Sequence, residues 1–208
     1  MLQLSEPAVQ PRRLSAEEFC LLARREASSL YRPRSEVLRM LAAGQAVGVC
    51  GPRAEPLAAL IELPLAANVE AAAALRHFLG RQGLGRGVVL GPPVGDRSCL
   101  PALLAAALPP AARRAGAGAL WAVLEATPDA EDLLPAYLDA GLALRAIRPL
   151  SGLAPCWLFA RTPVLRRGEP VWVPLADRPR LAALLGRGWP AVGYEATGSG
   201  AALALCPA

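Results

Sequence analysis

The sequence contains no lysine, and its 22 residues of the lysine or arginine type are all arginine. This absence excludes the lysine of a Walker A phosphate loop and any lysine that forms a Schiff base. There is one histidine, His77, so a metal site built on two histidines is also excluded, and we expect no metal. The net charge of +5 comes from scattered arginines whose longest clusters are pairs, so we expect no nucleic-acid partner.

Cysteines are few and apolar runs are short. The five cysteines are odd in number, far apart and without CxxC spacing, which is typical of reduced, buried thiols (Cys20, Cys50, Cys99, Cys156 and Cys206). The N-terminal segment has an acidic residue where a signal peptide has its apolar run. The longest apolar stretch, 98–112, is interrupted by prolines. We therefore expect a cytoplasmic protein with no membrane partner.

What the chain does have, 54% apolar residues over 208 positions, is enough for the core of one domain. Apolar periodicity predicts helices at 16–30, 35–41, 69–80, 98–115 (with a break or kink at Pro109–Pro110) and 129–140, and strands at 45–50, 57–65, 88–90, 118–126, 142–150 and 156–163. Ser15 is the expected N-cap of the first helix, and Gly51-Pro52-Arg53 is the expected turn of an antiparallel hairpin. The last forty residues repeat a strand, helix, strand, strand order. The pattern indicates a mixed α/β chain.

Two loops are candidates for holding a phosphate, residues 82–87 and residues 95–100. A phosphate loop needs a strand before it and a helix after it, because the free N–H groups at a helix start face the anion. The glycine-rich loop 82–87 follows a predicted helix and precedes a strand, so we interpret it as a helix-to-strand turn. Residues 95–100 have the required order, with Ser98 as the expected N-cap.

Residues 88–142 carry a set of motifs in a fixed order. Leu90-Gly91-Pro92 ends a strand, residues 95–100 open a helix, "ARRAG" at 112–116 ends it, "ALWAVLEA" is a buried strand, and Tyr137 precedes Gly141 by four residues. In this order the segment resembles the core of the GNAT acyl-CoA N-acyltransferases. The resemblance implies an α/β fold with a GNAT-like mixed, mostly antiparallel twisted sheet flanked by helices.

The resemblance also implies a site. Acetyl-CoA or a related acyl-CoA would lie between strands 88–90 and 119–125, and its pyrophosphate would contact the loop (cofactor-binding residues Val89, Leu90, Gly95, Asp96, Arg97, Ser98, Cys99 and Leu100). Tyr137 falls where many members of this family have a tyrosine that protonates the leaving thiolate. Glu62 and Glu125 end apolar runs and are the candidates for a general base.

The loop departs from the family pattern at four positions. Gly95 stands where the family has Arg or Gln, and Ser98 and Leu100 stand where it has two small residues. Asp96 brings a negative charge that, at ~5 Å and an effective dielectric of ~20, repels each unit of pyrophosphate charge by roughly 3 kcal/mol. Arg97 would offset part of this repulsion, and Leu100 would crowd the ligand's approach. Cys99, at a helix start, has the position that lowers a thiol pKa.

Two functions follow from these residues. The first is an N-acetyltransferase that moves an acyl group from acetyl-CoA to an amine of a small molecule or peptide. The second is a GNAT-like scaffold without CoA binding, which serves as a regulatory or protein-interaction module. We expect residues 1–163 to form the GNAT-like domain and 164–208 to pack on it. This extension would cover a sheet edge, form a wall of the acceptor site or make a homodimer contact.

Overall fold

The computed structural model of the chain describes residues 9–25, 34–67, 87–115, 120–149, 155–161, 168–198 and 200–207. The predicted helix at 69–80, His77 and most of the loop 82–87 lie outside these ranges. None of the helices within the described ranges has the length and apolar character needed to cross a bilayer.

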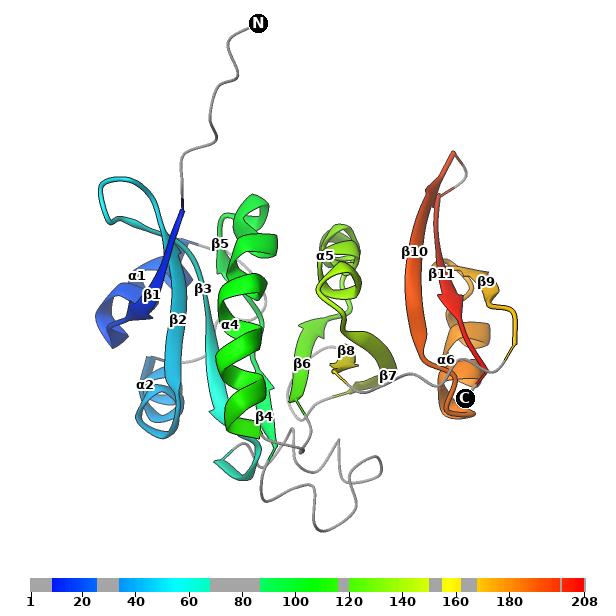
Figure 1. The fold of residues 1–208 in the computed structure, drawn as a ribbon, viewed down its shortest axis with the longest axis horizontal. Helices are drawn as coiled ribbons and strands as arrows, with labels where there is room; N and C mark the ends of the chain where they lie inside the picture. The colour runs from blue at the N-terminus through cyan, green and yellow to red at the C-terminus, as the bar shows by residue number, and fades with distance from the viewer. Residues whose placement is uncertain are drawn as a thin grey trace, which may run out of the picture.

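The described strands form one sheet in the order β1-β2-β3-β4-β6-β8-β7-β10-β11-β9, and β5 pairs with β3 beside this path (Figure 1). The strands are β1 (Gln10–Leu14), β2 (Gln45–Cys50), β3 (Pro56–Pro64), β4 (Val88–Leu90), β5 (Val94–Gly95), β6 (Leu120–Glu125), β7 (Ala143–Pro149), β8 (Pro155–Ala160), β9 (Val171–Pro174), β10 (Ala191–Thr197) and β11 (Gly200–Leu205). Among them only β4 and β6 pair in parallel, so the predicted mixed, mostly antiparallel α/β fold is confirmed.

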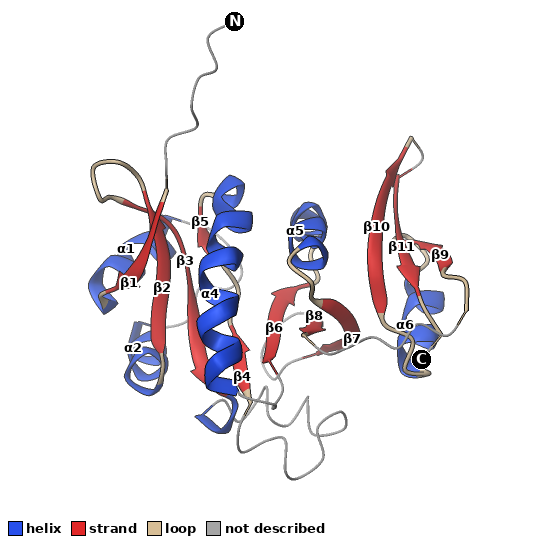
Figure 2. Ribbon diagram, in the orientation of Figure 1, coloured by secondary structure: helices blue, strands red, loops and turns tan. Residues whose placement is uncertain are grey.

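Helices cover both faces of this sheet (Figure 2). The described helices are α1 (Ala16–Arg25), α2 (Arg34–Ala43), the short 3-10 turns η1 (Leu65–Ala67), η2 (Arg97–Cys99) and η3 (Pro128–Leu133), and α4 (Leu100–Ala115), α5 (Leu134–Asp139) and α6 (Arg178–Gly186). One core cluster lies between the sheet and α4, α5 and α6, and a second lies under α1 and α2. The central strand β6 is buried along its whole length because both clusters meet it.

Several local predictions are confirmed. Ser15 caps α1 as expected: the N–H of Glu18 donates to the Ser15 hydroxyl at 3.2 Å, and the Ser15 N–H donates to the Glu18 carboxylate at 2.8 Å. This is a capping box, in which each residue satisfies a backbone donor of the other. The predicted hairpin around residues 51–53 is present as β2 and β3.

Other local predictions are corrected. The helix over 100–115 contains Pro109 and Pro110 and continues through both, so the expected break is absent, and a kink there stays a prediction. Strand β1 was not predicted from the pattern, since its first four residues are polar or proline and only Leu14 is buried. It forms because β2 offers it an antiparallel edge, with Leu14 opposite Ala46.

The C-terminal segment contributes strands β9, β10 and β11 to the same sheet, and it also contains helix α6. Strand β10 lies beside β7, and the two join at Ala191 and Leu144. The segment therefore covers the outer edge of β7, which is one of the places expected for it. The domain boundary near 163 stays a prediction.

Candidate functional site

The sheet divides between β4 and β6, the parallel pair. Their pairing runs from Val88 and Leu120 to Leu90 and Ala122 and ends there. The chain after β4 continues along β3, where β5 pairs at Ala58 and Ala59, while β6 continues along β8. The turn η2 follows β5 and leads into helix α4, so the N-terminus of α4 lies at this division (Figure 1). This is the place at which the resemblance puts an acyl-CoA.

Three backbone N–H groups, those of Ser98 and Cys99 in η2 and of Leu100 at the first residue of α4, already have acceptors within the chain. The Ser98 N–H donates to the Asp96 carboxylate at 2.9 Å, and the Ser98 hydroxyl donates to the same oxygen at 2.7 Å. The Cys99 N–H donates to the Asp96 carbonyl at 3.1 Å, and the Leu100 N–H donates to the Arg97 carbonyl. Asp96 is thus the N-cap of η2, the turn that leads into α4, and the expectation that Ser98 takes this role is wrong. The two hydrogen bonds from Ser98 lower the pKa of Asp96, which favours its charged form.

Gly95 has a backbone role at this turn. Its φ is +96°, and an added Cβ would lie 2.2 Å from the carbonyl oxygen of Leu57. Only glycine fits this conformation and this close approach to β3. The arginine or glutamine that the family motif has at this position would require the turn to be rebuilt.

Arg97 connects the two sides of the division. Its guanidinium donates to the backbone carbonyl of Asp129, which lies in η3 after β6. Arg97 itself lies in the turn after β5, so the contact crosses from one side to the other. One donor of the guanidinium expected to offset Asp96 is therefore already used in a contact within the chain.

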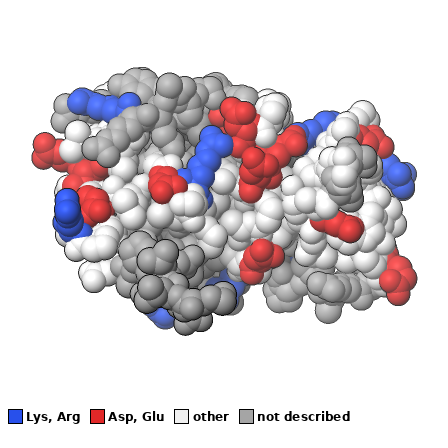
Figure 3. Space-filling view, turned by 90° about the horizontal axis from the view of Figure 1, so that it is seen from above, with Lys and Arg blue, Asp and Glu red and all other residues white. Residues whose placement is uncertain are grey.

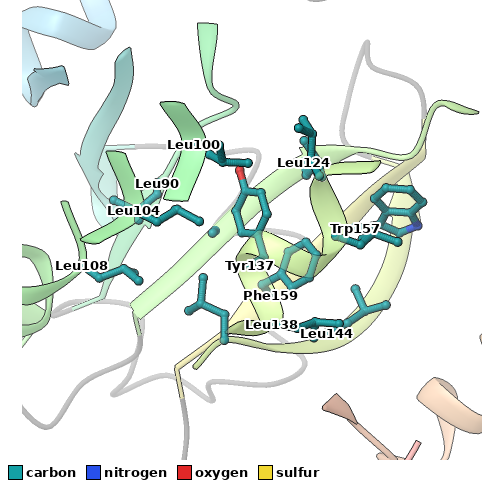
Figure 4. Close-up of a cluster of buried hydrophobic side chains, with 14 of the residues drawn as sticks. Leu90, Leu100, Leu104, Leu108, Leu124, Tyr137, Leu138, Leu144, Trp157 and Phe159 are labelled. Carbon is teal, nitrogen blue, oxygen red and sulfur yellow. The ribbon is translucent and has the colours of Figure 1, made fainter. Parts of the chain in front are cut away.

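Leu100 and Tyr137 lie in the core beneath this turn (Figure 4). Tyr137 is 1% exposed, and its ring stacks on Phe159 with centroids 4.7 Å apart. In Figure 4 its hydroxyl points toward Leu100, which is also 1% exposed. The hydroxyl has no hydrogen-bond partner among the described residues. Burial raises the pKa of Tyr137 well above its usual value, so the phenol stays protonated and enclosed by apolar side chains.

Replacing Tyr137 by phenylalanine tests whether this hydroxyl has any partner. Removing a buried donor that makes no hydrogen bond removes its desolvation cost, so we expect Tyr137→Phe to raise the free energy of unfolding by about 1 kcal/mol. Urea denaturation of both proteins measures the difference. A loss of 1 kcal/mol or more on this scale would mean that the hydroxyl is bonded in solution.

Glu62 is held at the opposite end of α4. It is 4% exposed, and both of its carboxylate oxygens bond to the guanidinium of Arg114. Gln45 donates to the same carboxylate at 3.0 Å. Arg114 follows Leu100 by fourteen residues, which at 1.5 Å per residue places it about 20 Å along the helix from the turn at 96–100. The geometry suits a carboxylate that fastens α4 to β3, and a role as general base stays a prediction without geometric support.

The other predicted site residues lie closer to the division. Val89 and Leu90 are buried in β4 on opposite faces of the sheet, and Glu125 ends β6 with 4% of its surface exposed. Cys99 is 9% exposed, and burial together with the nearby Asp96 raises the pKa of its thiol. The expected lowering of this pKa by the helix start is wrong. No group of three or more potential metal ligands gathers within the described part of the chain.

The sequence analysis did not predict which residues form hydrogen bonds and ion pairs with these side chains. Arg114 was visible only as one of a pair of arginines, although a glutamate inside the apolar run of β3 needs a positive partner when it is buried. The Arg97 contact with Asp129 joins residues 32 positions apart and left no local signal.

The comparisons agree with this geometry at the level of the fold. No family model matches the sequence, and no curated protein matches it by sequence. The fold is similar to that of the ribosomal-protein-S18-alanine N-acetyltransferase from Escherichia coli, with a TM-score of 0.52 and 15% identity over 78% of this chain and 97% of that one. It is also similar to a protein assigned as a phosphinothricin N-acetyltransferase, with a TM-score of 0.53 and 12% identity over 76% and 99% of the two chains.

A third similar structure is an acetyltransferase from Desulfovibrio desulfuricans that is assigned to the GNAT family. Its TM-score is 0.50, and 17% of residues are identical over 74% of this chain and 98% of that one. Each of the three matches covers about three quarters of this chain. The chain therefore has the fold of the GNAT-family N-acetyltransferases.

Proposed function

We propose that this chain is a GNAT-fold scaffold that does not bind acyl-CoA at the division between β4 and β6, and that it serves as a regulatory or protein-interaction module. The observation that carries this proposal is the occupied helix start. The N–H groups of Ser98, Cys99 and Leu100 all donate within the chain, and one acceptor is the carboxylate of Asp96. A helix start binds an anion through N–H groups that have no other partner.

The charge around this turn supports the same conclusion. Asp96, Asp129 and Asp132 are exposed, and Arg97 is the exposed basic residue of the turn. Figure 3 shows the molecule from above, and several acidic side chains lie near the middle of this face with a basic side chain among them. A pyrophosphate approaching the start of α4 would meet the carboxylate of Asp96 in the turn itself. The repulsion acts before any contact forms and adds to the loss of the free N–H groups.

The burial of Leu100 in the core also supports the proposal. Its side chain belongs to the main core cluster together with Tyr137, Leu104 and Leu124. A thiolate that Tyr137 could protonate would need the space beside its hydroxyl, where Figure 4 shows Leu100. An acyl-CoA could reach Tyr137 only after this part of the core had moved.

Acetyl-CoA binding tests the proposal directly. Thermal unfolding is followed with and without 1 mM ligand, and the Escherichia coli S18-alanine N-acetyltransferase is the positive control. A ligand present at about 100 times its Kd stabilises the folded protein by about 2.7 kcal/mol, which raises the Tm of a chain of this size by about 5–10 °C. We expect this chain to shift by less than about 1 °C. A shift of several degrees would overturn the scaffold proposal.

N-acyl transfer is the second candidate, and the division of the sheet beside a helix start favours it. In this alternative acetyl-CoA is the donor, and the acceptor is an amine of a small molecule or peptide. The backbone of 95–100 would hold the pyrophosphate after the Asp96 carboxylate had left the Ser98 N–H, a cap worth about 1 kcal/mol. Tyr137 would act as the acid and Glu125 as the base. A several-degree shift with acetyl-CoA would support this candidate.

A further inference from the structure

The C-terminal unit, residues 168–207, is joined to the rest of the sheet by a narrow connection. Within the unit, β10 pairs with β11 from Ala191 to Thr197, and β11 pairs with β9 over residues 202–205. Toward the rest of the molecule, β10 meets β7 at one pair of described residues, Ala191 and Leu144. The unit therefore has its own strand ladder and contributes little backbone pairing to the strand that it covers.

The unit also contains helix α6, whose first turn is capped by a residue of the unit itself. The Asp177 carboxylate accepts the N–H of Arg180 at 3.2 Å and caps α6. Leu181 and Leu185 of α6 are buried and face the main core. Apolar packing is thus the main force that holds the unit on β7, and it covers Leu144 and Trp157, both 0% exposed.

One polar clamp adds to this packing. Arg178, the first residue of α6, forms an ion pair with Glu131 of η3. Its guanidinium carbon also lies 5.3 Å from the ring centroid of Trp157 in β8, within the range of a cation–π contact. Arg178 thereby connects the C-terminal unit to two elements of the preceding part of the chain.

The same joint contains buried donors without acceptors. Arg178 Nη1 and Trp157 Nε1 are both buried, and neither has a hydrogen-bond partner among the described residues. Unsatisfied buried donors make the docked arrangement less favourable than a fully bonded one. A unit with its own ladder, one shared strand pair and an imperfect polar joint has the features of a segment that opens cooperatively on its own.

We propose that residues 168–207 form a reversible cover over β7, which the Arg178 clamp holds closed and which opens as one unit while the rest of the sheet stays folded. Opening exposes Trp157 and the outer edge of β7. This conformational device does not depend on whether the chain binds acyl-CoA.

Amide hydrogen exchange of the full chain, followed by mass spectrometry, tests the cover. The variant Arg178→Met removes the clamp and keeps a long apolar side chain. The matched control is Arg180→Met, which changes the same charge on an exposed position of the same helix. We expect Arg178→Met to speed exchange in β9, β10 and β11 by about tenfold, since it removes one ion pair and one cation–π contact. Exchange in β2 and β3 should change by less than about twofold.

A second measurement avoids mutation. Because the Arg178–Glu131 pair is partly exposed, 1 M NaCl screens it. Salt should speed exchange in the cover of the wild-type chain and leave β2 and β3 unchanged. Equal acceleration of the cover and of β2 and β3, or no acceleration of the cover in Arg178→Met, would overturn the proposal.

Discussion

Replacing Arg114 by methionine is expected to lower the free energy of unfolding by about 3 kcal/mol, the lower end of the range for breaking a buried ion pair. The reason is the burial of its partner, since Glu62 is 4% exposed while the Arg114 side chain is 41% exposed. Without Arg114 the carboxylate stays in the core with only Gln45 as a described donor. Chemical denaturation at pH 7 measures the loss.

Replacing Glu62, the other member of the pair, should lower the free energy of unfolding much less. Glu62→Gln leaves a neutral amide in the core, and the freed guanidinium of Arg114 can turn to water, so we expect a loss of about 1 kcal/mol. Arg113→Met is the matched control, because Arg113 precedes Arg114 and is exposed. Equal losses for Arg114→Met and Arg113→Met would show that the pair contributes nothing to holding α4 on β3.

Replacing Leu100 by alanine is expected to lower the free energy of unfolding by about 3 kcal/mol. The side chain is 1% exposed and lies in the main core between α4 and Tyr137. Its removal leaves a cavity beside the ring that stacks on Phe159. The result would be informative because the family motif has a small residue at this position. A large loss would mean that this position is a core contact in this chain.

Leu100→Met is the control for this experiment. Methionine has a similar volume and adapts its shape, so we expect a loss below about 1.5 kcal/mol. Urea denaturation of the three proteins gives the comparison. If Leu100→Ala were as stable as the wild type, the leucine would not be packed in solution, and the space beside Tyr137 would be open to a ligand.

Both replacements concern α4, which connects the candidate site to the fold. At its start Asp96 and Arg97 bind the turn to itself and to η3. Near its end Arg114 binds Glu62 of β3. The helix that presents a phosphate site in the family motif is here fastened at both ends by side chains of the chain itself, which is consistent with a structural use of this helix.

The sequence by itself determined the order and type of most elements. Apolar runs bounded by Gly and Pro predicted β2, β3, β4, β6, β7 and β8, since a strand that is buried on both faces leaves a continuous apolar run. The cap at Ser15 was readable because a capping box is formed by residues three apart. The motif order over 88–142 was enough to predict the GNAT-like sheet.

Only the tertiary structure decided what the side chains of the candidate site do. Asp96 was recognisable as a charge near an expected pyrophosphate, but its role as the N-cap depends on the path of the backbone through Gly95. The partners of Glu62, Arg97 and Arg178 lie 52, 32 and 47 positions away along the chain. Such contacts are set by how the layers pack, and a local pattern of residues contains no information about them. Asp96, the loop 95–100 and Tyr137 were therefore recognisable in the sequence. The contacts that tie them to the rest of the protein were not.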